Sequence, residues 1–318
     1  MPALFFTEDD VRELLDMETT ISVVEKMFEE LGAGRAVSVP RVRAKAPGIL
    51  LHTMSASAEY LGYVGWKAYT TTARGAKFMV GLYRVDSGEL VALIEADYLG
   101  QLRTGAASGV ATEYLARPES SIVGVFGTGK QARMQLKAVC SVRKVTQVEV
   151  YSRNEERRRR FAEEMSAWCN TEVIPVHTPE SAAREKDIVI TATSGTGPAF
   201  DGRVLDEGTH LNVIGVNFLN RCEIDVATVR RADVIACDSI EQCKLEAGDF
   251  VQALEEGVTD WPLMHDLSDV VSGRATSRAT PEAITLFKSV GLAIEDVALA
   301  AKVFELGREA CVGHPLPF

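Results

Sequence analysis

A glycine-rich segment near the middle of the chain has the residue types of a phosphate-binding loop. It follows an apolar run at 121–126 and reads Gly127-Thr128-Gly129-Lys130-Gln131-Ala132. In the pattern G-x-G-x-x-A, the first glycine permits a tight turn, the second lets the backbone approach a pyrophosphate, and the small last residue lets helix and strand pack closely. The phosphates then bind at the helix N-terminus, where free N–H groups favour anions. The segment therefore predicts a dinucleotide site.

The same segment nearly matches the loop of nucleoside triphosphatases, G-x-x-x-x-G-K-[ST], through Gly124, Gly129 and Lys130. Two features argue against that alternative. Gln131 stands where the motif needs a hydroxyl to hold magnesium, and Gly124 lies inside the apolar run instead of in the loop. A glycine turn with a purely structural role also stays open. The regular alternation of strands and helices after the loop favours the dinucleotide.

The end of the next predicted strand, at 146–152, bears on the type of dinucleotide. An acidic residue there would bind the 2′-hydroxyl of NAD, whereas an arginine suits the 2′-phosphate of NADP. Ser152 and Arg153 occupy this corner, and we expect Asn154 and Arg157 to lie at the same site. A solvated helix face is the alternative for the arginine run at 157–160. The corner favours NADP(H) and leaves NAD(H) possible.

Cationic residues precede the glycine loop and could bind a substrate carboxylate. Arg41, Arg43 and Lys45 alternate along an extended segment, Lys67 lies in an otherwise apolar strand, and Arg103 lies on a helix of small residues. A single cation of this kind is more often a surface group whose stem packs on apolar neighbours. Several in one small domain indicate a carboxylate pocket, since arginine binds a carboxylate in a bidentate manner and lysine can also give a proton.

The elements that must position these residues fall into two groups. Helical periodicity and a capping box at Thr7 and Asp10 predict two helices before residue 34, and short β-like runs up to residue 96 predict an antiparallel sheet. A helix at 96–114 follows. Beyond Pro118, parallel strands are expected to alternate with helices. The predicted strands are 121–126, 146–152, 171–176, 187–192, 210–216 and 233–237.

The fold class predicted is α/β, a Rossmann-type doubly wound parallel sheet plus an α+β domain with an antiparallel sheet. The dinucleotide domain comprises 118–291, which leaves 1–117 with 292–318 for the second domain, where the cations that could bind substrate lie. A long amphipathic helix is expected at 294–310.

Composition excludes several classes of partner. The 318 residues carry a formal net charge of -11, which disfavours nucleic acid and anionic membrane surfaces as partners. No signal peptide or spanning apolar run is visible, and six dispersed cysteines predict reduced thiols and no metal site. We therefore expect a cytoplasmic protein.

Several segments in the same order resemble the ornithine cyclodeaminase/mu-crystallin family almost end to end. They include Pro40-Arg41-Val42-Arg43, Gly65-Trp66-Lys67, Leu102-Arg103-Thr104-Gly105, the glycine loop, 208–215, 221–225 and 285–296. The resemblance implies a homodimer whose amino-terminal sheets pair, with the carboxy-terminal helix completing that domain and the active site between the two domains.

The resemblance also implies roles for individual residues. Arg43 and Arg103 would hold the substrate carboxylate, Lys67 would contact the carboxylate and the reacting group, and we place Met54 in the same substrate site. The nicotinamide half of the cofactor would be lined by Thr104, Thr193, Ser194, Val216, Asn217, Ser289, Val290 and Gly291.

One position departs from ornithine cyclodeaminases. Those enzymes carry an aspartate after the corresponding strand, whereas this chain has Asn217. An amide is no general base at neutral pH and cannot pair with an amine as a carboxylate does. The sequence is therefore similar to the ketimine reductase-like branch, which reduces imines such as 1-pyrroline-2-carboxylate to amino acids with NAD(P)H. An alanine-type dehydrogenase, a cyclodeaminase and a binding protein for NADPH and a small acid remain alternatives.

Overall fold

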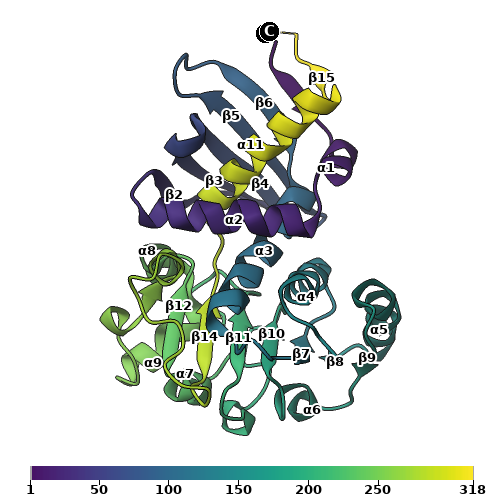
Figure 1. Cartoon of the computed structure of the whole chain (residues 1–318), viewed down its shortest axis with the longest axis vertical. Helices are drawn as coiled ribbons and strands as arrows, with labels where there is room; N and C mark the ends of the chain where they lie inside the picture. The colour runs from purple at the N-terminus through teal and green to yellow at the C-terminus, as the bar shows by residue number, and fades with distance from the viewer. Residues whose placement is uncertain (1, 318) are drawn as a thin grey trace. The chain divides into compact units, whose positions relative to one another are not determined.

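A computed structural model describes residues 2–317 and shows two compact units (Figure 1). Unit 1 comprises Met1–Arg103 and Gly291–Phe318, and unit 2 comprises Thr104–Val290. The sequence placed the first boundary after residue 117. In the structure this boundary lies within helix α3 (Asp97–Leu115). The helix belongs to unit 1 up to Arg103 and to unit 2 from Thr104.

Unit 1 is built on a seven-stranded sheet of order β15-β1-β6-β5-β4-β3-β2. The strands from β2 to β6 are antiparallel, as predicted, while β1 runs parallel to β6. The strand β1, absent from the sequence prediction, is only three residues long. The bounds are β1 Leu4–Phe6, β2 Ala36–Ala46, β3 Ile49–Ala58, β4 Tyr63–Thr72, β5 Gly75–Arg84, β6 Leu90–Glu95 and β15 His314–Pro315.

Helix α11 (Ala293–Ala310) lies across one face of this sheet and packs on β3, β4 and α2 (Met17–Gly32) (Figure 1). The helix expected at 294–310 is confirmed, and its first turns are buried, including Glu295 and Asp296. The predicted capping box at Thr7 and Asp10 is confirmed at the start of α1 (Glu8–Leu14). A short 3-10 turn, η1 (Glu59–Leu61), links β3 to β4.

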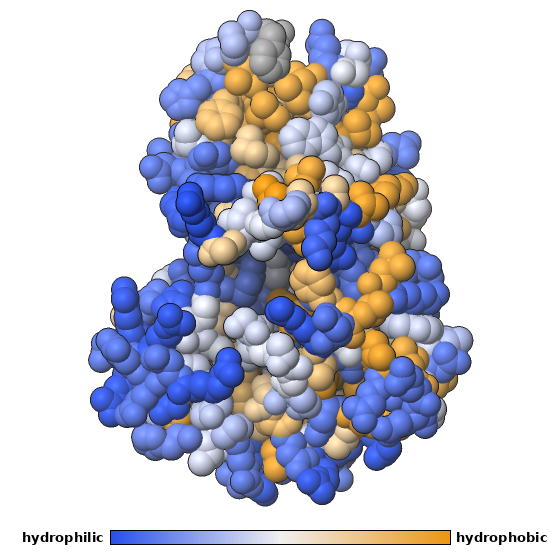
Figure 2. Space-filling view, turned by 180° about the vertical axis from the view of Figure 1, so that it is seen from behind, coloured by the Kyte–Doolittle hydropathy of each residue, from blue (hydrophilic) through white to orange (hydrophobic). Residues whose placement is uncertain are grey.

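The opposite face of the sheet exposes apolar side chains. Alternation along a strand sends successive side chains to opposite faces, so the neighbours of the buried residues on β2 and β3 point outward. Figure 2 shows such side chains over this sheet. The exposed apolar residues are Val37, Val39, Val42, Ile49, Leu51 and Val64.

Unit 2 is built on an eight-stranded parallel sheet of order β13-β12-β14-β11-β10-β7-β8-β9. From β9 through β7 to β14 the order is that of a doubly wound nucleotide-binding fold, which reverses direction between β7 and β10. The prediction of this fold class is confirmed. The bounds are β7 Ile122–Phe126, β8 Gln147–Tyr151, β9 Val173–Pro175, β10 Ile188–Thr191, β11 His210–Val213, β12 Val234–Cys237, β13 His265–Asp266 and β14 Thr285–Lys288.

Helices connect these strands. Alanine and other small residues let α6 approach β7 closely, while Phe161 and Met165 of α5 pack into the core beneath β8. The helices are α4 Lys130–Val142, α5 Glu155–Cys169, α6 Pro179–Ala183, α7 Val226–Arg231, α8 Ile240–Glu246, α9 Val251–Glu255 and α10 Leu267–Val271, with 3-10 turns η2 Gly202–Val204, η3 Gly248–Phe250 and η4 Trp261–Leu263. Among the described helices, none combines the length and apolar character needed to cross a bilayer.

Candidate functional site

The glycine loop follows β7 directly and opens α4, as the pattern requires. Gly127 has φ +106°, and a Cβ there would lie 2.3 Å from the Ala192 carbonyl oxygen, so only glycine fits. Gly129 differs, because a Cβ built on it would meet no protein atom within 4 Å. The open space beside Gly129 is where the backbone can approach a pyrophosphate.

The start of α4 is not capped by a side chain. Its N-cap residue is Gly129, which makes no side-chain hydrogen bond to the first turn. The side-chain oxygen Oε1 of Gln131 is buried without a hydrogen-bond partner among the described residues. Ala132 is fully buried against the core. The helix N-terminus suits a phosphate, whereas the Gln131 amide oxygen, an acceptor, suits a donor such as a ribose hydroxyl.

Gly124 decides against the triphosphatase alternative. It lies inside β7, opposite Glu149 and Val189 of the neighbouring strands. A Cβ there would lie 1.8 Å from the Ala182 carbonyl oxygen, so Gly124 is required by packing against α6. It therefore takes no part in a phosphate loop.

The end of β8 holds the predicted ribose corner. Ser152 Oγ lies 3.4 Å from Thr128 Oγ1 and donates to the Asn154 carbonyl oxygen, 3.1 Å away. The side chains of Arg153 and Arg157 are exposed. Arg158 is buried instead, where it donates to the Ser152 carbonyl oxygen (2.9 Å) and lies over the Tyr151 ring. Of the arginine run, Arg158 therefore stabilises the end of β8 from the buried side.

The residues predicted to line the nicotinamide lie at the carboxyl ends of neighbouring strands. Thr193 and Ser194 follow β10, Val216 and Asn217 follow β11, and Ser289 follows β14. In doubly wound sheets, dinucleotides bind at the carboxyl ends of the strands. Thr104 lies on α3, where its carbonyl oxygen accepts a hydrogen bond from Gln135 of α4 (2.9 Å).

A buried cluster of charges lies in unit 1, between β4 and α11. Lys67 Nζ donates to Asp296 Oδ1 at 2.7 Å. Arg103 donates from Nε to the same oxygen (3.2 Å) and from Nη1 to Glu295 Oε2 (2.7 Å). Lys67 and Arg103 are 2% and 6% exposed. The structure thus brings two predicted substrate residues together and adds two carboxylates that the sequence prediction lacked.

Gly291 and Arg41 complete this cluster. Arg41, 7% exposed, donates from Nη2 to the Gly291 carbonyl oxygen at 3.2 Å. Gly291 has φ +84°, and a Cβ there would lie 2.6 Å from Arg103 Nη1. Glycine at this position therefore leaves room for both guanidinium groups. Gly291 was predicted to line the cofactor, and within unit 1 it contacts the cation cluster.

Arg43, the predicted carboxylate ligand, lies two residues further along β2. It is half buried, whereas Arg41 faces the cluster. The irregular pairing of β2 with β3 between Val39 and Val42 changes the simple alternation assumed from the sequence. Lys45 is exposed. The three cations thus occupy different environments.

Cations and carboxylates are paired within the cluster. Lys67 pairs with Asp296, and Arg103 pairs with both Asp296 and Glu295, while Arg41 lies buried beside them. Burial, followed by the charge of Arg103, lowers the pKa of Lys67 to about 8, although Asp296 acts in the opposite direction. The arrangement suits a monocarboxylate beside a lysine that can give up its proton.

Aromatic rings lie beside Lys67 on the same sheet face. His52 stacks on Tyr69 at 4.1 Å between ring centroids, and Phe78 follows at 4.8 Å from Tyr69. Burial and the nearby Arg43 and Arg41 lower the pKa of His52 to about 4, which keeps its ring neutral. Met54, predicted in the substrate site, is paired with Lys67 across β3 and β4 and is buried.

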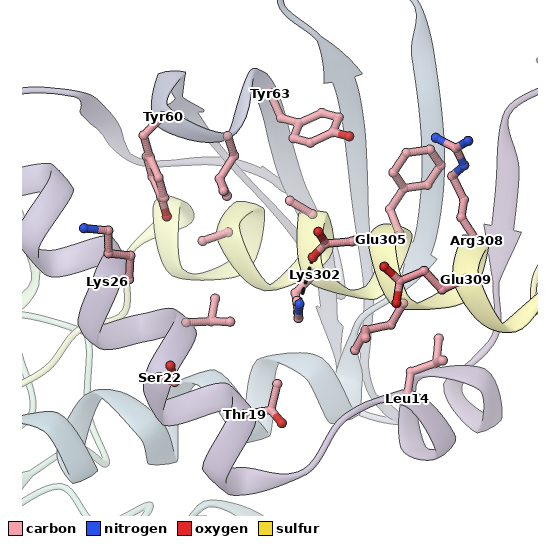
Figure 3. Close-up of a pocket in the computed structure, with 16 residues that line it drawn as sticks. Leu14, Thr19, Ser22, Lys26, Tyr60, Tyr63, Lys302, Glu305, Arg308 and Glu309 are labelled. Atoms are coloured by element: carbon pink, nitrogen blue, oxygen red, sulfur yellow. Dashed lines mark hydrogen bonds and ion pairs between the residues drawn. The ribbon is translucent and has the colours of Figure 1, made fainter.

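An open groove elsewhere in unit 1 contains none of these groups. It lies between α2, α11 and η1, where Lys302 pairs with Glu305 (Figure 3). None of its lining residues is a predicted site residue. The candidate functional groups are therefore the cation cluster of unit 1 and, in unit 2, the dinucleotide loops.

The sequence profile of the ornithine cyclodeaminase/mu-crystallin family matches residues 2–310. The chain belongs to this family. The family membership implied by the resemblance is therefore confirmed.

Relatives within the family are similar over nearly their whole length. A Delta(1)-pyrroline-2-carboxylate reductase of Bacillus cereus is 30% identical, with 99% of this chain and 100% of the relative covered. The solved structure of the Thermococcus litoralis Delta(1)-pyrroline-2-carboxylate reductase with NADH and L-proline is 35% identical (TM-score 0.94, 98% and 100% covered). An archaeal alanine dehydrogenase dimer with bound NAD is 31% identical (TM-score 0.94, both chains covered fully).

Sequence reasoning missed Glu295 and Asp296 for a physical reason. Both fall in the helix expected at 294–310, and acidic residues in a first turn stabilise a helix start without any partner. A signal was available, since the residues around them, Leu292 to Ala301, are otherwise all apolar. Two acids in such a run indicate buried partners of opposite charge.

Proposed function

We propose that this protein uses NAD(P)H to reduce a carboxylate-bearing imine, such as 1-pyrroline-2-carboxylate, to an amino acid. The observation that carries the proposal is the buried cluster of Arg41, Lys67 and Arg103, in which the lysine has a pKa of about 8. The likeness to reductases named for this substrate supports it.

The residues of this chain would divide the work. Arg103 and Arg41 bind and orient the substrate carboxylate, because a guanidinium group offers two parallel donors to it. Lys67 protonates the imine nitrogen, which makes the imine carbon a better acceptor. A bound reduced nicotinamide would supply the hydride. Orientation and charge placement are then the protein's contribution to the rate.

Ornithine cyclisation is a weaker candidate on the evidence of Asn217, and reductive amination of alanine type is the stronger alternative. The second reaction needs the same carboxylate and proton groups, and an alanine dehydrogenase is among the similar structures. Its substrate would be a 2-oxo acid with ammonia, so the two reactions differ in whether the imine is supplied or formed in the site.

A substrate panel separates these functions. The protein is incubated with NADH or NADPH and cyclic imines, or with 2-oxo acids with and without ammonia, and cofactor oxidation is followed. We expect the highest kcat/KM with a cyclic imino acid. Release of proline and ammonia from ornithine and NAD at a comparable rate would refute the proposal. Tight binding of cofactor without turnover of any substrate would instead identify a binding protein.

For the cofactor we propose use of both dinucleotides with a preference for NADPH. The exposed Arg153 and Arg157, with Ser152 in place of an acid, support a 2′-phosphate at the end of β8. The bound NADH and NAD of two similar structures support use of the non-phosphorylated form as well.

Replacing Ser152 by aspartate is expected to turn the preference toward NADH. The new carboxylate would repel the 2′-phosphate and accept a hydrogen bond from the 2′-hydroxyl, a change on the order of one to two decades in relative affinity. The measurement is kcat/KM for both cofactors in wild type and variant. A wild type that already prefers NADH would show that the arginines point to solvent.

We also propose a homodimer formed through the exposed face of the seven-stranded sheet. The apolar residues on that face, Val37, Val39, Val42, Ile49, Leu51 and Val64, support an interface, since a patch of this kind marks an association site. Light scattering is expected to give twice the mass of one chain. In Leu51→Glu a shift toward the monomer is expected, and an unchanged dimer would place the interface elsewhere.

A further inference from the structure

Three buried charged side chains lie beneath the carboxyl ends of β10, β11 and β14. Glu223 and Lys288 are fully buried and Asp249 is 4% exposed. None of them was predicted as a site residue, and none takes part in the proposed proton or carboxylate chemistry. Buried charges are costly unless paired, so their retention requires a role in structure or function.

Glu223 joins two loops of the predicted nicotinamide site. Its Oε1 accepts a hydrogen bond from the backbone N–H of Thr193 at 2.6 Å, in the loop after β10. Its Oε2 accepts from the backbone N–H of Gly215, in the loop after β11, and from Thr191 Oγ1 at 3.1 Å. A single carboxylate therefore fixes the spacing of these two loops.

Gly215 shows how closely the loops approach. A Cβ at this position would lie 2.4 Å from Glu223 Oε1 and 2.4 Å from the Thr193 carbonyl oxygen. Both distances are far below van der Waals contact, so any other residue would force the carboxylate or the backbone away. Glycine at position 215 is explained by the bridge that Glu223 makes.

Asp249 and Lys288 extend the bridge to a third strand. Asp249 Oδ1 accepts from the backbone N–H of Glu223 at 2.6 Å, and its Oδ2 pairs with Lys288 Nζ at 2.6 Å. Lys288, the last residue of β14, also donates to the Val216 carbonyl oxygen at 2.9 Å. Hydrogen bonds of buried charges are strong because the surroundings have a low dielectric constant.

We propose that Glu223, Asp249 and Lys288 are positioning residues that hold the loops binding the nicotinamide half of the cofactor. The inference rests on the dinucleotide part of the proposed function. The sheet reverses direction between β7 and β10, and a dinucleotide spans this point with one half on each side. The glycine loop and Ser152 lie on the β7–β8 side, whereas the network touches backbone groups only on the β10, β11 and β14 side.

The experiment compares two ligands that differ only in the nicotinamide, NADH and ADP-ribose, by titration calorimetry. The substitution Glu223→Gln replaces one carboxylate oxygen by an NH₂ group. One of the two backbone N–H groups, that of Thr193 or that of Gly215, then faces a donor where it had an acceptor. We expect NADH to bind roughly tenfold more weakly, the effect of about one lost hydrogen bond, and ADP-ribose to bind as in wild type. KM for NADH is expected to rise with a fall in kcat.

Two further variants keep the test decisive. The double variant Lys288→Met/Asp249→Asn removes both charges of the ion pair at once, while Glu223 keeps the hydrogen bonds that it accepts from Thr191, Thr193 and Gly215, so the variant is expected to fold and to show the same selective loss. Asp187→Asn is the matched control. Asp187 also accepts hydrogen bonds from two backbone N–H groups, those of Ser121 (2.8 Å) and Ile122 (2.9 Å), but it lies at the amino-terminal ends of the strands. Its ratio of NADH to ADP-ribose affinity should equal that of wild type.

An equal loss for both ligands in the network variants, or no loss, would overturn the inference and leave the network a purely structural role. Failure of Glu223→Gln to fold, with unchanged binding in the double variant, would do the same. Binding is measured without substrate, so the outcome is independent of the reaction. A wild type that binds NADH but reduces no imine would refute the proposed function and leave this inference standing.

Discussion

Replacing Lys67 by methionine is expected to lower kcat for imine reduction by about 100-fold or more, the usual contribution of a positioned general acid. Methionine keeps most of the side-chain volume and removes the proton. The Lys67 ammonium is buried and held by Asp296, so water has little access to replace it. The measurement is steady-state kcat with 1-pyrroline-2-carboxylate and NADH, after thermal unfolding confirms that the variant is folded.

The pH dependence of wild type gives a second readout of the same group. The proton donor is the charged lysine, and its pKa is about 8. The rate should therefore be level with respect to Lys67 below this pH and fall as the pH rises through it. Lys45→Met, at an exposed lysine of β2, is the control and should keep both rate and profile. An unchanged kcat in Lys67→Met would remove lysine from the mechanism.

Replacing Arg41 by alanine is expected to raise KM for the imine by at least about 30-fold, with a smaller change in kcat. Loss of one partner of a buried charge pair costs roughly 2–5 kcal/mol in binding, and the substrate carboxylate would lose such a partner. Arg41 faces the cluster and donates to Gly291, whereas Arg43 is half buried beside it. Kinetics of both alanine variants distinguish the two arginines.

Arg43→Ala is expected to change KM less than Arg41→Ala does. A larger effect at position 43 would mean that Arg43 binds the substrate carboxylate, as the family resemblance implies. Arg41 would then serve only to hold the Gly291 backbone. The sign of this difference decides which arginine the substrate contacts.

The parallel sheet was largely predictable because its signals are local. Each predicted strand from 121–126 to 233–237 overlaps a strand of unit 2, since short apolar runs between helices have few other structures available. The strand β14 was missed, although it lies in the middle of the sheet. It is only four residues long and ends in Lys288, a charge that normally argues against a buried strand.

The candidate site was predictable in its residue types more than in its geometry. Lys67 and Arg103 stood out because each interrupts an apolar pattern, and the structure brings both to Asp296. The choice between Arg41 and Arg43 cannot be made from alternation, because residues two apart in a strand share a face; Arg41 lies in the irregular pairing between Val39 and Val42, and Arg43 lies opposite His52. Contacts such as that of Glu223 with Thr193 join distant segments, and a single sequence carries no signal for their pairing.

Unit 1 is made from the two ends of the chain, and this has a consequence for protein synthesis. Its first 103 residues leave the ribosome long before α11, which supplies Glu295 and Asp296 to the buried cations. Domains generally fold as units from the amino terminus, but here Lys67 and Arg103 meet their counter-ions only after α11 has been synthesised. A chain cut short before residue 293 would lack both carboxylates, and its buried cations would be left without Glu295 and Asp296.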